Sequence, residues 1–453
     1  IEANDFPPNK FFYEWQGRED VIGGSVFKTL TNMPKGAALH IHSGSSGGVN
    51  WMLNEGLAME GCYVNMGPDD PDTCVSVLGG QVVPCDSSNL SVMSVLHGMI
   101  AFYDPAVPAR APPAGVGFVS TAELRENDLA GFTETMRKLI SVGDFSGLKN
   151  MTSREAWAQF QPIFRITAPF QAYLPAFQAY LVNTFDILSR DGSQHVEIRA
   201  ALGNGTFGGL YDLEGNVYLG GQVIEAYEGA LELFQEQFPS FGGGNFTLRV
   251  IPSTLRVLPS GLVDGDLEHA FALKQAYPVT VVGFDAVSEE DTGHATVDYL
   301  SVWEAIPTLE AKYGVVMPLF FHDGESDSRN NTNLVDAILL GSHRIGHGFN
   351  AFWSPKVRHE LKRRGNMPLE VCPISNQILR YVDNLQTHPA GAYIAEGLPL
   401  VLSNDDPGVF GYEGLTYDFW VAAMAWQLDL RALKVLSRNS LTYSALSDDD
   451  KDA

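Results

Sequence analysis

Short apolar runs, most of them rich in β-branched residues, alternate along the chain with longer amphipathic stretches. Stretches such as VIEAYEGALELFQEQF and EHAFALKQA have the periodicity of helices. The runs are continuously apolar, which is typical of parallel strands covered by helices. Eight such runs predict an α/β fold, a closed (β/α)8 TIM barrel. The predicted strands are 37–42, 195–200, 246–253, 279–287, 314–325, 339–347, 368–376 and 398–406.

The spacing of the predicted strands is uneven. The gap between residue 42 and residue 195 is far longer than one helix needs. Within it, residues 50–115 hold the Pro-rich DPAVPARAPPAGVG and predict an inserted small lobe. Residues 1–30, rich in Phe, Trp and Tyr, predict an N-terminal arm, and residues 447–453 predict a solvated acidic tail. The barrel itself is then expected to span residues 31–446.

Composition narrows the classes of function. The 453 residues include 29 Lys and Arg against 54 Asp and Glu, a formal net charge of −25. Such acidity excludes an extended nucleic-acid surface, because phosphate neutralisation needs clustered Lys and Arg. The sequence has no apolar run long enough to predict a membrane span. A net charge of −25 leaves open whether one small phosphorylated molecule can bind.

Cysteines and sequons predict the compartment. Cys62, Cys74 and Cys85 lie close together, Cys372 lies in an apolar run, and no CxxC pair supports a thiolate zinc site. One disulfide among the first three cysteines is expected. Together with the low Lys content and five Asn-x-Ser/Thr sequons, it predicts a secreted eukaryotic glycoprotein. The start at Ile1 predicts a mature chain whose leader has been removed. The sequons are at Asn89, Asn150, Asn204, Asn245 and Asn330.

Polar residues follow the predicted strands, where TIM barrels carry their chemistry. In the first strand, the imidazoles of His40 and His42 face the same side, because residues i and i+2 of a strand do so. Imidazoles and one carboxylate suit a Zn²⁺ ion with an open position for water. The predicted ligands are His40, His42, His322 and Asp405. Other polar residues at strand ends are Asp285, Glu325, His347, Ser375, Asn376 and Asp406.

Each of these residues also has a structural interpretation. The HxH pair could be a core pair whose nitrogens are hydrogen-bonded within the protein. His347 could bridge backbone groups, and Asp405 with Asp406 could form a turn before Pro407. Their joint placement at strand ends of one barrel favours a catalytic site, and the set fits hydrolytic deamination. Glu325 can protonate a ring nitrogen, and His347 can take the proton of the attacking water. Asp406 can orient that water or contact a purine nitrogen.

Eight long segments in order carry a family resemblance. The chain resembles the adenosine deaminase superfamily, and most closely its secreted branch, the adenosine deaminase-related growth factors. The resemblance implies one Zn²⁺ per subunit, conversion of adenosine to inosine and ammonia, and a homodimer formed through the N-terminal arm. The segments are MPKGAALHIHSG, AWAQFQPIFRI, HVEIRA, VVGFDAVSEEDTGH, FFHDGE, HRIGHGF, LEVCPISNQIL and LSNDDPGVFGYEGLTYDF.

The resemblance also implies roles for single residues. Glu325 matches the proton donor to purine N1, His347 the water-orienting base, and Asp406 a contact to water and purine N7. Ser288 falls where relatives place a glycine whose N–H contacts purine N3. Further residues implied near the substrate are Gly324 and Trp157, although core packing is an alternative for Trp157. The resemblance implies a disulfide in the lobe after the first strand, for which spacing favours Cys62–Cys85.

One segment departs from the family pattern. After the HxH pair, adenosine deaminases commonly carry an acidic residue near the ribose 5′-hydroxyl, but this chain has HSGSSGG. Ser43, Gly44 and Ser45 predict an anion-binding nest, so 5′-AMP joins adenosine as an expected substrate. The same composition is typical of a flexible loop at the mouth. Two alternatives stay open: an adenine nucleotide as main substrate, and a secreted receptor ligand, suggested only by the growth-factor branch.

Overall fold

Two four-stranded parallel sheets form the barrel of the computed structural model, which describes residues 6–85, 92–142, 147–203, 208–239 and 245–452. Parallel bridges between Phe284 and Leu319 and between Ile41 and Asp405 join the two sheets at both edges. The eight strands therefore close into a ring, and the predicted TIM barrel is confirmed. In order around the ring they are β1 (Gly36–His42), β8 (Ser193–Ala201), β11 (Thr247–Leu255), β12 (Asp285–Val287), β13 (His322–Asp323), β14 (Ile345–His347), β15 (Leu369–Val371) and β16 (Leu400–Leu402).

The strands of the second sheet have two or three residues each, fewer than the predicted runs. The run 368–376 shows one reason. Its residues from Pro373 onward form helix α14 (Pro373–Ile378) instead of strand. Proline suits the first helical position, because the N–H that it lacks has no partner there in any helix.

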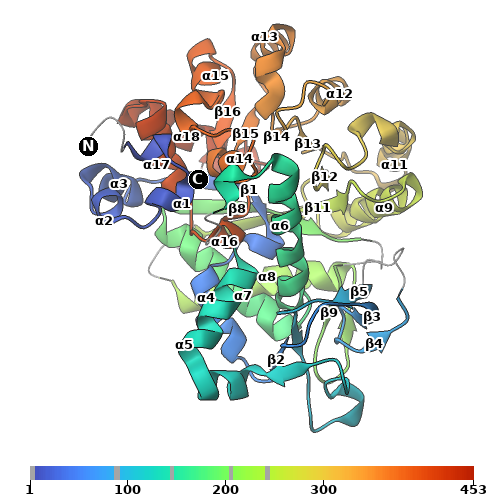
Figure 1. Ribbon diagram of the computed structural model, residues 1–453. Helices are drawn as coiled ribbons and strands as arrows, with labels where there is room; N and C mark the ends of the chain where they lie inside the picture. Colours follow the sequence, from blue (N-terminus) through green and yellow to red (C-terminus); the bar gives the residue numbers. More distant parts are fainter. Residues whose placement is uncertain (1–5, 86–91, 143–146, 204–207, 240–244, 453) are drawn as a thin grey trace.

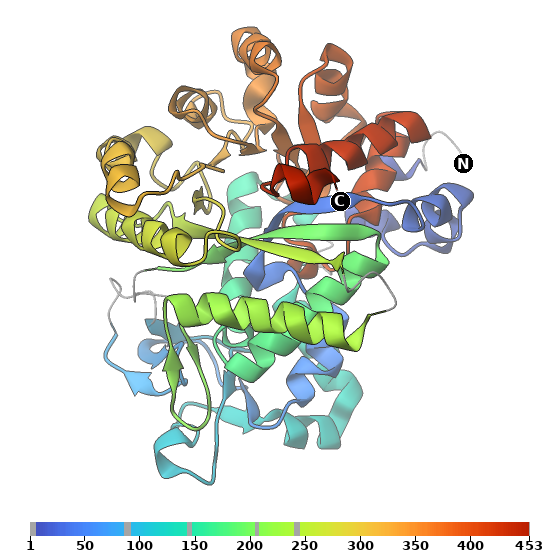
Figure 2. The ribbon, with the colours of Figure 1, turned by 180° about the vertical axis from the view of Figure 1, so that it is seen from behind.

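Helices cover the outside of the barrel, as Figures 1 and 2 show from opposite sides. Their ends follow local sequence signals. For example, Ser354 Oγ accepts the N–H of Val357 before α13, and Gly365, with φ of 68°, ends that helix. The helices after the strands are α8 (Gly221–Gln237), α9 (Ser260–Ala276), α11 (Ile306–Tyr313), α12 (Asn333–Leu340), α13 (Pro355–Arg364), α15 (Ala390–Glu396) and α18 (Leu430–Thr442).

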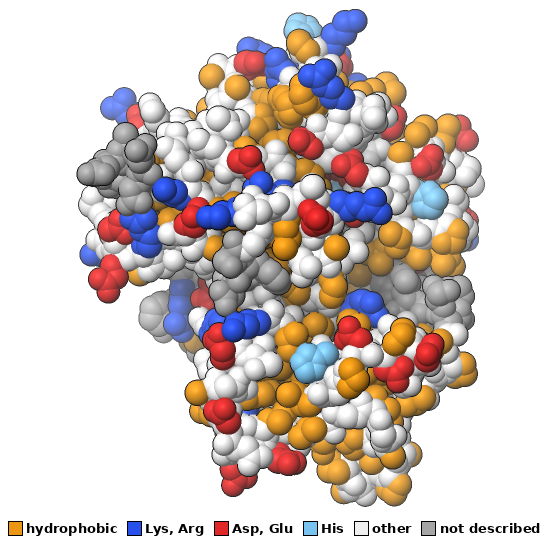
Figure 3. All heavy atoms as spheres, viewed as in Figure 1, with side chains coloured by type: hydrophobic (Ala, Val, Ile, Leu, Met, Phe, Trp, Pro, Cys, Tyr) orange, Lys and Arg blue, Asp and Glu red, His pale blue; other side chains and the backbone are white. Residues whose placement is uncertain are grey.

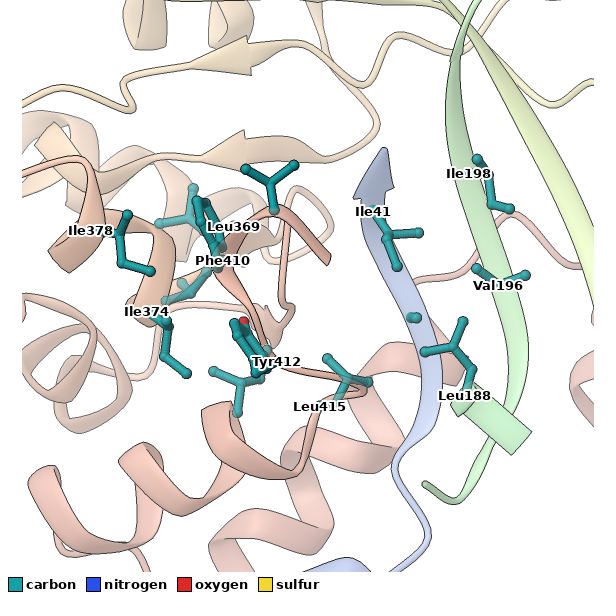
Figure 4. Packing of buried hydrophobic residues seen from close by; sticks show 14 of the residues in the cluster. Ile41, Leu188, Val196, Ile198, Leu369, Ile374, Ile378, Phe410, Tyr412 and Leu415 are labelled. Carbon is teal, nitrogen blue, oxygen red and sulfur yellow. The ribbon is translucent and has the colours of Figure 1, made fainter. Parts of the chain in front are cut away.

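Apolar side chains of the strands and helices share one large core. Ile41 of β1 and Ile198 of β8 are fully buried on adjacent strands. Figure 4 shows these residues, with the cluster continuing past β1 to Leu369 of β15 and Phe410. This continuous apolar packing makes the barrel a rigid support for side chains at its mouth.

The long segment between β1 and β8 contains two small antiparallel sheets followed by three helices, α5 (Thr121–Ile140), α6 (Ser153–Thr167) and α7 (Leu174–Arg190). Figure 1 shows the small sheets below the barrel. Apolar residues of this segment form a second core cluster. One sheet consists of β6 (Ile100–Phe102), β2 (Cys62–Asn65) and β7 (Phe118–Ser120), and the other of β4 (Val82–Val83), β3 (Asp70–Ser76) and β5 (Val92–Val95).

The chain ends pack on the barrel domain. Phe12 and Trp15 are fully buried against Tyr417 and Trp420 of α17 (Thr416–Ala425). Near the C-terminus, α19 (Asp448–Asp452) carries the acidic tail. On the face in Figure 3, basic side chains are scattered among acidic and apolar ones. Among the described residues, no helix has the length and apolar character needed to cross a membrane.

The disulfide joins Cys74 to Cys85, with 5.2 Å between their Cα atoms. The expected pair Cys62–Cys85 is wrong. In the register of β3 with β4, Cys74 lies opposite Val83, which brings Cys85 beside it. Cys62 lies in the other small sheet and is buried as a free thiol, as is Cys372. Spacing along the chain could not reveal which strands pair.

We expect a non-reduced digest to yield one cross-linked peptide pair containing Cys74 and Cys85. Cys62 and Cys372 should react with an alkylating reagent only after denaturation, because both thiols are buried. Mass spectrometry before and after denaturation measures both results. A peptide that links Cys62 to Cys85 would contradict the structure.

Candidate active site

Four residues from three strand ends meet at the mouth of the barrel. His40 and His42 end β1, His322 begins β13, and Asp405 follows β16. His42 Nε2 lies 3.1 Å from both His322 Nε2 and Asp405 Oδ1, and His40 Nε2 lies 3.3 Å from the same Asp405 oxygen. Their nitrogen and oxygen atoms converge as the ligands of one cation do.

A fifth residue, His347, lies beside this set. One ligand atom each of His40, His322, His347 and Asp405 lies within 4.8 Å of the others. His347 Nε2 is 4.0 Å from Asp405 Oδ2, farther than His42 Nε2 is from Asp405 Oδ1. His42 forms a second group of potential ligands with Asp405 and Asp406, so Asp405 belongs to both groups.

Carboxylates behind the cluster orient two of the imidazoles. His40 Nδ1 donates to Glu370 Oε2 and His322 Nδ1 to Asp285 Oδ2, each at 2.7 Å. Burial alone would raise the pKa of both carboxyl groups, but neighbouring groups hold it well below its usual range. For Asp285 these neighbours are His322 and Arg199, and for Glu370 they are Arg199 and Arg344. Both carboxylates accept, so Nδ1 of each imidazole donates and its Nε2 points to the cluster. His40 Nε2 is buried and forms no hydrogen bond to any described group, which fits a metal ligand.

Two buried arginines hold these carboxylates. Arg199 of β8 binds Asp285 Oδ2 through Nε at 2.6 Å and Glu370 Oε2 through Nη2 at 2.5 Å. Arg344 binds Glu370 Oε1 at 2.6 Å and Glu197 Oε2 at 2.5 Å. All five side chains are fully buried, so the barrel interior contains a network of paired charges.

The predicted proton-transfer residues lie next to the cluster. His347 Nε2 is 3.6 Å from Glu325 Oε1, and both side chains are buried. Burial, with the charges of Asp405, Glu290 and Asp406, raises the pKa of Glu325 well above its usual value, which favours the protonated acid. Burial lowers the pKa of His347 well below its usual value, which favours a neutral imidazole able to accept a proton.

Asp406 also lies at this site. Burial and the charge of Asp405 raise its pKa well above the usual value. Ser45 Oγ donates to Asp406 Oδ1. Asp405 is held separately, because Ser375 Oγ donates to its Oδ2 at 2.7 Å. The adjacent carboxyl groups are thus held by different partners.

Three residues at strand ends have backbone conformations that favour glycine. Ser288, His347 and Asp405 have φ of 92°, 62° and 63°. Such conformations cost about 1–3 kcal/mol each and persist where the surrounding structure enforces them, often at functional sites. Ser288 thus retains a glycine-like backbone at the position where relatives are expected to have glycine. Gly324, also predicted to lie near the substrate, has φ of 80°.

The segment 43–48 is a mostly buried turn at the end of β1. Ser43, Gly44 and Ser45 form a 3-10 turn, and Gly44 is half-buried. Ser43 Oγ donates to Gln171 Oε1 at 2.5 Å and accepts from Tyr227. The hydroxyls of Ser43 and Ser45 are therefore bonded to protein groups.

Trp157 of α6 packs in the core. Its Nε1 donates to Tyr381 at 2.7 Å, and the side chain is 7% exposed. The indole N–H is therefore already bonded, as core packing requires. Among the sequons, Asn150, Asn245 and Asn330 are exposed, whereas Asn89 and Asn204 lie outside the described residues.

The residues that sequence reasoning missed lie deeper in the barrel. Arg199, Arg344, Glu197 and Glu370 all come from predicted strands or their edges. Their signal in the sequence was a charged residue inside an otherwise apolar run, as in HVEIRA and PLEVCPIS. A charge at such a position needs a buried partner.

The fold and the site together define a TIM-barrel enzyme with a buried His–Asp cluster able to bind a metal. Residues 144–453 match the family model described as adenosine deaminase. Adenosine deaminase 2 of Sus scrofa is 31% identical over 455 residues, which cover 98% of this chain and 81% of the relative. Adenosine deaminase 2-A of Danio rerio is 32% identical over 458 residues, which cover 100% of this chain and 83% of the relative.

Solved structures with low identity share the fold. The apo N6-methyl-AMP deaminase of Arabidopsis thaliana has a TM-score of 0.59 at 15% identity, covering 94% of this chain and 96% of the other. An adenine deaminase of Arthrobacter aurescens has a TM-score of 0.50 at 19% identity, covering 93% and 96%. The chain belongs to the adenosine deaminase family, in the branch of the relatives named adenosine deaminase 2. It is an adenosine deaminase enzyme that acts on a small molecule.

We expect Arg199→Lys to lower the free energy of unfolding by about 3–5 kcal/mol, because one ammonium cannot replace both guanidinium contacts, so Asp285 or Glu370 loses one of its buried partners. Metal affinity should fall about 10–100-fold, because Asp285 and Glu370 orient two ligands. Denaturant unfolding and competition with a chelating dye measure these changes.

The matched control is Arg249→Lys on the neighbouring strand β11. Arg249 pairs at 3.1 Å with Asp450, which is 49% exposed. This control should change stability by less than about 1 kcal/mol, because solvent screens the pair. Equal losses of unfolding free energy in the two variants would show that the Arg199 network stabilises the protein no more than the exposed Arg249–Asp450 pair does.

Proposed function

We propose that the enzyme catalyses zinc-dependent hydrolytic deamination of adenosine to inosine and ammonia. The observation that carries the proposal is the side-by-side placement of the His–Asp cluster with Glu325 and His347. A metal site beside one protonated acid and one neutral base is what replacement of an amino group by water requires.

The donor set fits zinc. His40, His42, His322 and Asp405 supply three imidazoles and one carboxylate, the ligand types that Zn²⁺ prefers. The unbonded, buried His40 Nε2 supports this assignment. A zinc ion held by these residues would supply Lewis-acid activation of a water molecule near neutral pH.

The chain's own groups account for the proton transfers. Protonated Glu325 would donate to purine N1, which makes C6 more electrophilic. Neutral His347 is placed to accept the proton of the attacking water. The C6–O bond forms and the C6–N6 bond breaks. The proton that His347 took from the water passes to the departing amino group, which leaves as ammonia. The remaining hydroxyl proton at C6 returns to the Glu325 carboxylate, which gives the keto form of inosine. Asp406 is proposed to hold the water and purine N7, with Ser288 and Gly324 offering backbone contacts to the purine.

We expect Glu325→Gln to lower kcat for adenosine by about 10²–10⁴-fold, because the amide cannot supply the proton. The change of ultraviolet absorbance as adenosine becomes inosine measures the rate. Zinc content should equal that of the unaltered enzyme, because Glu325 is not proposed as a ligand. Full activity in the variant would contradict the proposed acid.

The 5′ end of the substrate is proposed to lie near residues 43–48. We propose adenosine as the main substrate, with 5′-AMP accepted less well. Support comes from the hydroxyls of Ser43 and Ser45, which already bind Gln171 and Asp406 and so are not free to receive a phosphate. Gly44 leaves room at this turn, since a Cβ there would touch only the Phe164 ring, at 3.3 Å.

Gly44→Asp tests this placement, with Gly44→Asn as the neutral control of the same size. We expect the ratio of kcat/KM for 5′-AMP to that for adenosine to fall by about tenfold or more in the aspartate variant relative to the asparagine variant. The reason is repulsion between the carboxylate and the phosphate. An equal ratio in both variants would place the 5′ end elsewhere.

We also propose that the enzyme is extracellular, glycosylated and a homodimer. The Cys74–Cys85 disulfide and the exposed sequon asparagines Asn150, Asn245 and Asn330 support the first two. In the N-terminal arm, Ile22 and Val26 are exposed and can contribute to a contact between subunits, whereas Phe12 and Trp15 pack within their own chain.

A further inference from the structure

We infer that Glu290 is a positioning residue for Glu325, a role that rests on the proposed function of Glu325 as the acid. Its carboxylate accepts hydrogen bonds from two consecutive backbone N–H groups. Glu290 Oε1 accepts from the N–H of Glu325 at 2.6 Å, and Oε2 accepts from the N–H of Gly324 at 3.0 Å. Both bonds are made to the backbone that carries the acid.

Other groups hold Glu290 in place. Its Oε2 accepts from the side-chain amides of Asn331 and Asn333, each at 2.7 Å. Asn333 is anchored in turn, because its Oδ1 accepts the N–H of Thr296. With 5% of its surface exposed, Glu290 is a fixed carboxylate that accepts four N–H donors.

The backbone of residues 322–325 needs such a support. β13 ends at Asp323, so Gly324 and Glu325 follow the strand outside regular structure. Their buried N–H groups would lack partners without Glu290, at a cost of about 1–3 kcal/mol each. Gly324 adopts φ of 80°, which favours glycine, and its carbonyl accepts the N–H of Asn350 at 2.9 Å. Glu290 supplies the acceptor for the N–H side of this turn.

The start of the same segment is held by a cation. Arg256 donates to the carbonyl oxygen of His322 and binds Asp323 Oδ1 at 2.5 Å. A guanidinium therefore holds the first carbonyl of residues 322–325, and a carboxylate holds their last two N–H groups. This arrangement sets the distance of Glu325 from His347, which is 3.6 Å between Oε1 and Nε2.

The test is Glu290→Gln in the zinc-loaded enzyme. Glutamine has one acceptor oxygen and an NH₂ group, so one of the two backbone N–H groups loses its acceptor. We expect kcat for adenosine to fall about 10–100-fold with KM changed less than threefold, because the reacting geometry is disturbed more than substrate binding. Rates are divided by bound zinc, measured by elemental analysis.

The matched control is Glu289→Gln, one residue earlier. Glu289 is also nearly buried, at 8% exposure, but it binds the Thr292 hydroxyl at 2.7 Å and makes no hydrogen bond to residues 322–325. Its kcat should stay within threefold of the unaltered enzyme. Asn331→Ala, which removes one donor to Glu290, should lower kcat less than Glu290→Gln does.

A double-mutant cycle with Glu325→Asp separates positioning from a general structural role. If Glu290 acts through Glu325, Glu290→Gln should cost less than threefold in the Glu325→Asp background, because the acid is already displaced. Equal losses in both backgrounds, a loss that disappears after division by bound zinc, or an unchanged kcat would each overturn the inference. Absence of adenosine turnover in the unaltered enzyme would instead overturn the proposed function.

Discussion

Arg199 is the residue on which the site depends most. Its guanidinium joins Asp285 and Glu370 across the inside of the barrel, and each carboxylate orients one imidazole of the His–Asp cluster. Unpaired, these charges would be very costly in an apolar interior, so the network is stable only when all its members are present. The strands that carry it are thereby tied to one relative arrangement, and the cluster at their ends acquires its geometry from that arrangement.

The same burial determines the proton chemistry. Because the site is shielded from water and rich in carboxyl groups, the pKa of Glu325 is raised and that of His347 is lowered. The raised pKa favours a protonated Glu325 and the lowered pKa favours a neutral His347, and the two side chains lie 3.6 Å apart. Glu290 and Arg256 bind the backbone of residues 322–325, which carries Glu325. These two charged residues therefore also help to fix the position of Glu325.

The segment between β1 and β8 forms one wall of the site. Gln171 contacts Ser43, and Phe164 lies beside Gly44, so the turn after the HxH pair is shaped by helices inserted before β8. The barrel strands carry the chemistry, whereas this segment surrounds the turn proposed to meet the 5′ end of the substrate. Under the proposed placement of the 5′ end, discrimination among adenine nucleosides and nucleotides would depend on this insertion as well as on the barrel.

The sequence by itself determined the order of strands and helices and the residues at strand ends, because apolar periodicity is local and strand ends of one barrel must converge. His40, His42, His322 and Asp405 were named on that ground and meet in the structure. Only the tertiary structure decided the disulfide partner of Cys85, the buried turn at Ser43–Ser45 and the partners of Arg199 and Glu290. Each of these depends on which distant segments pack together, and spacing along the chain carries no information about that.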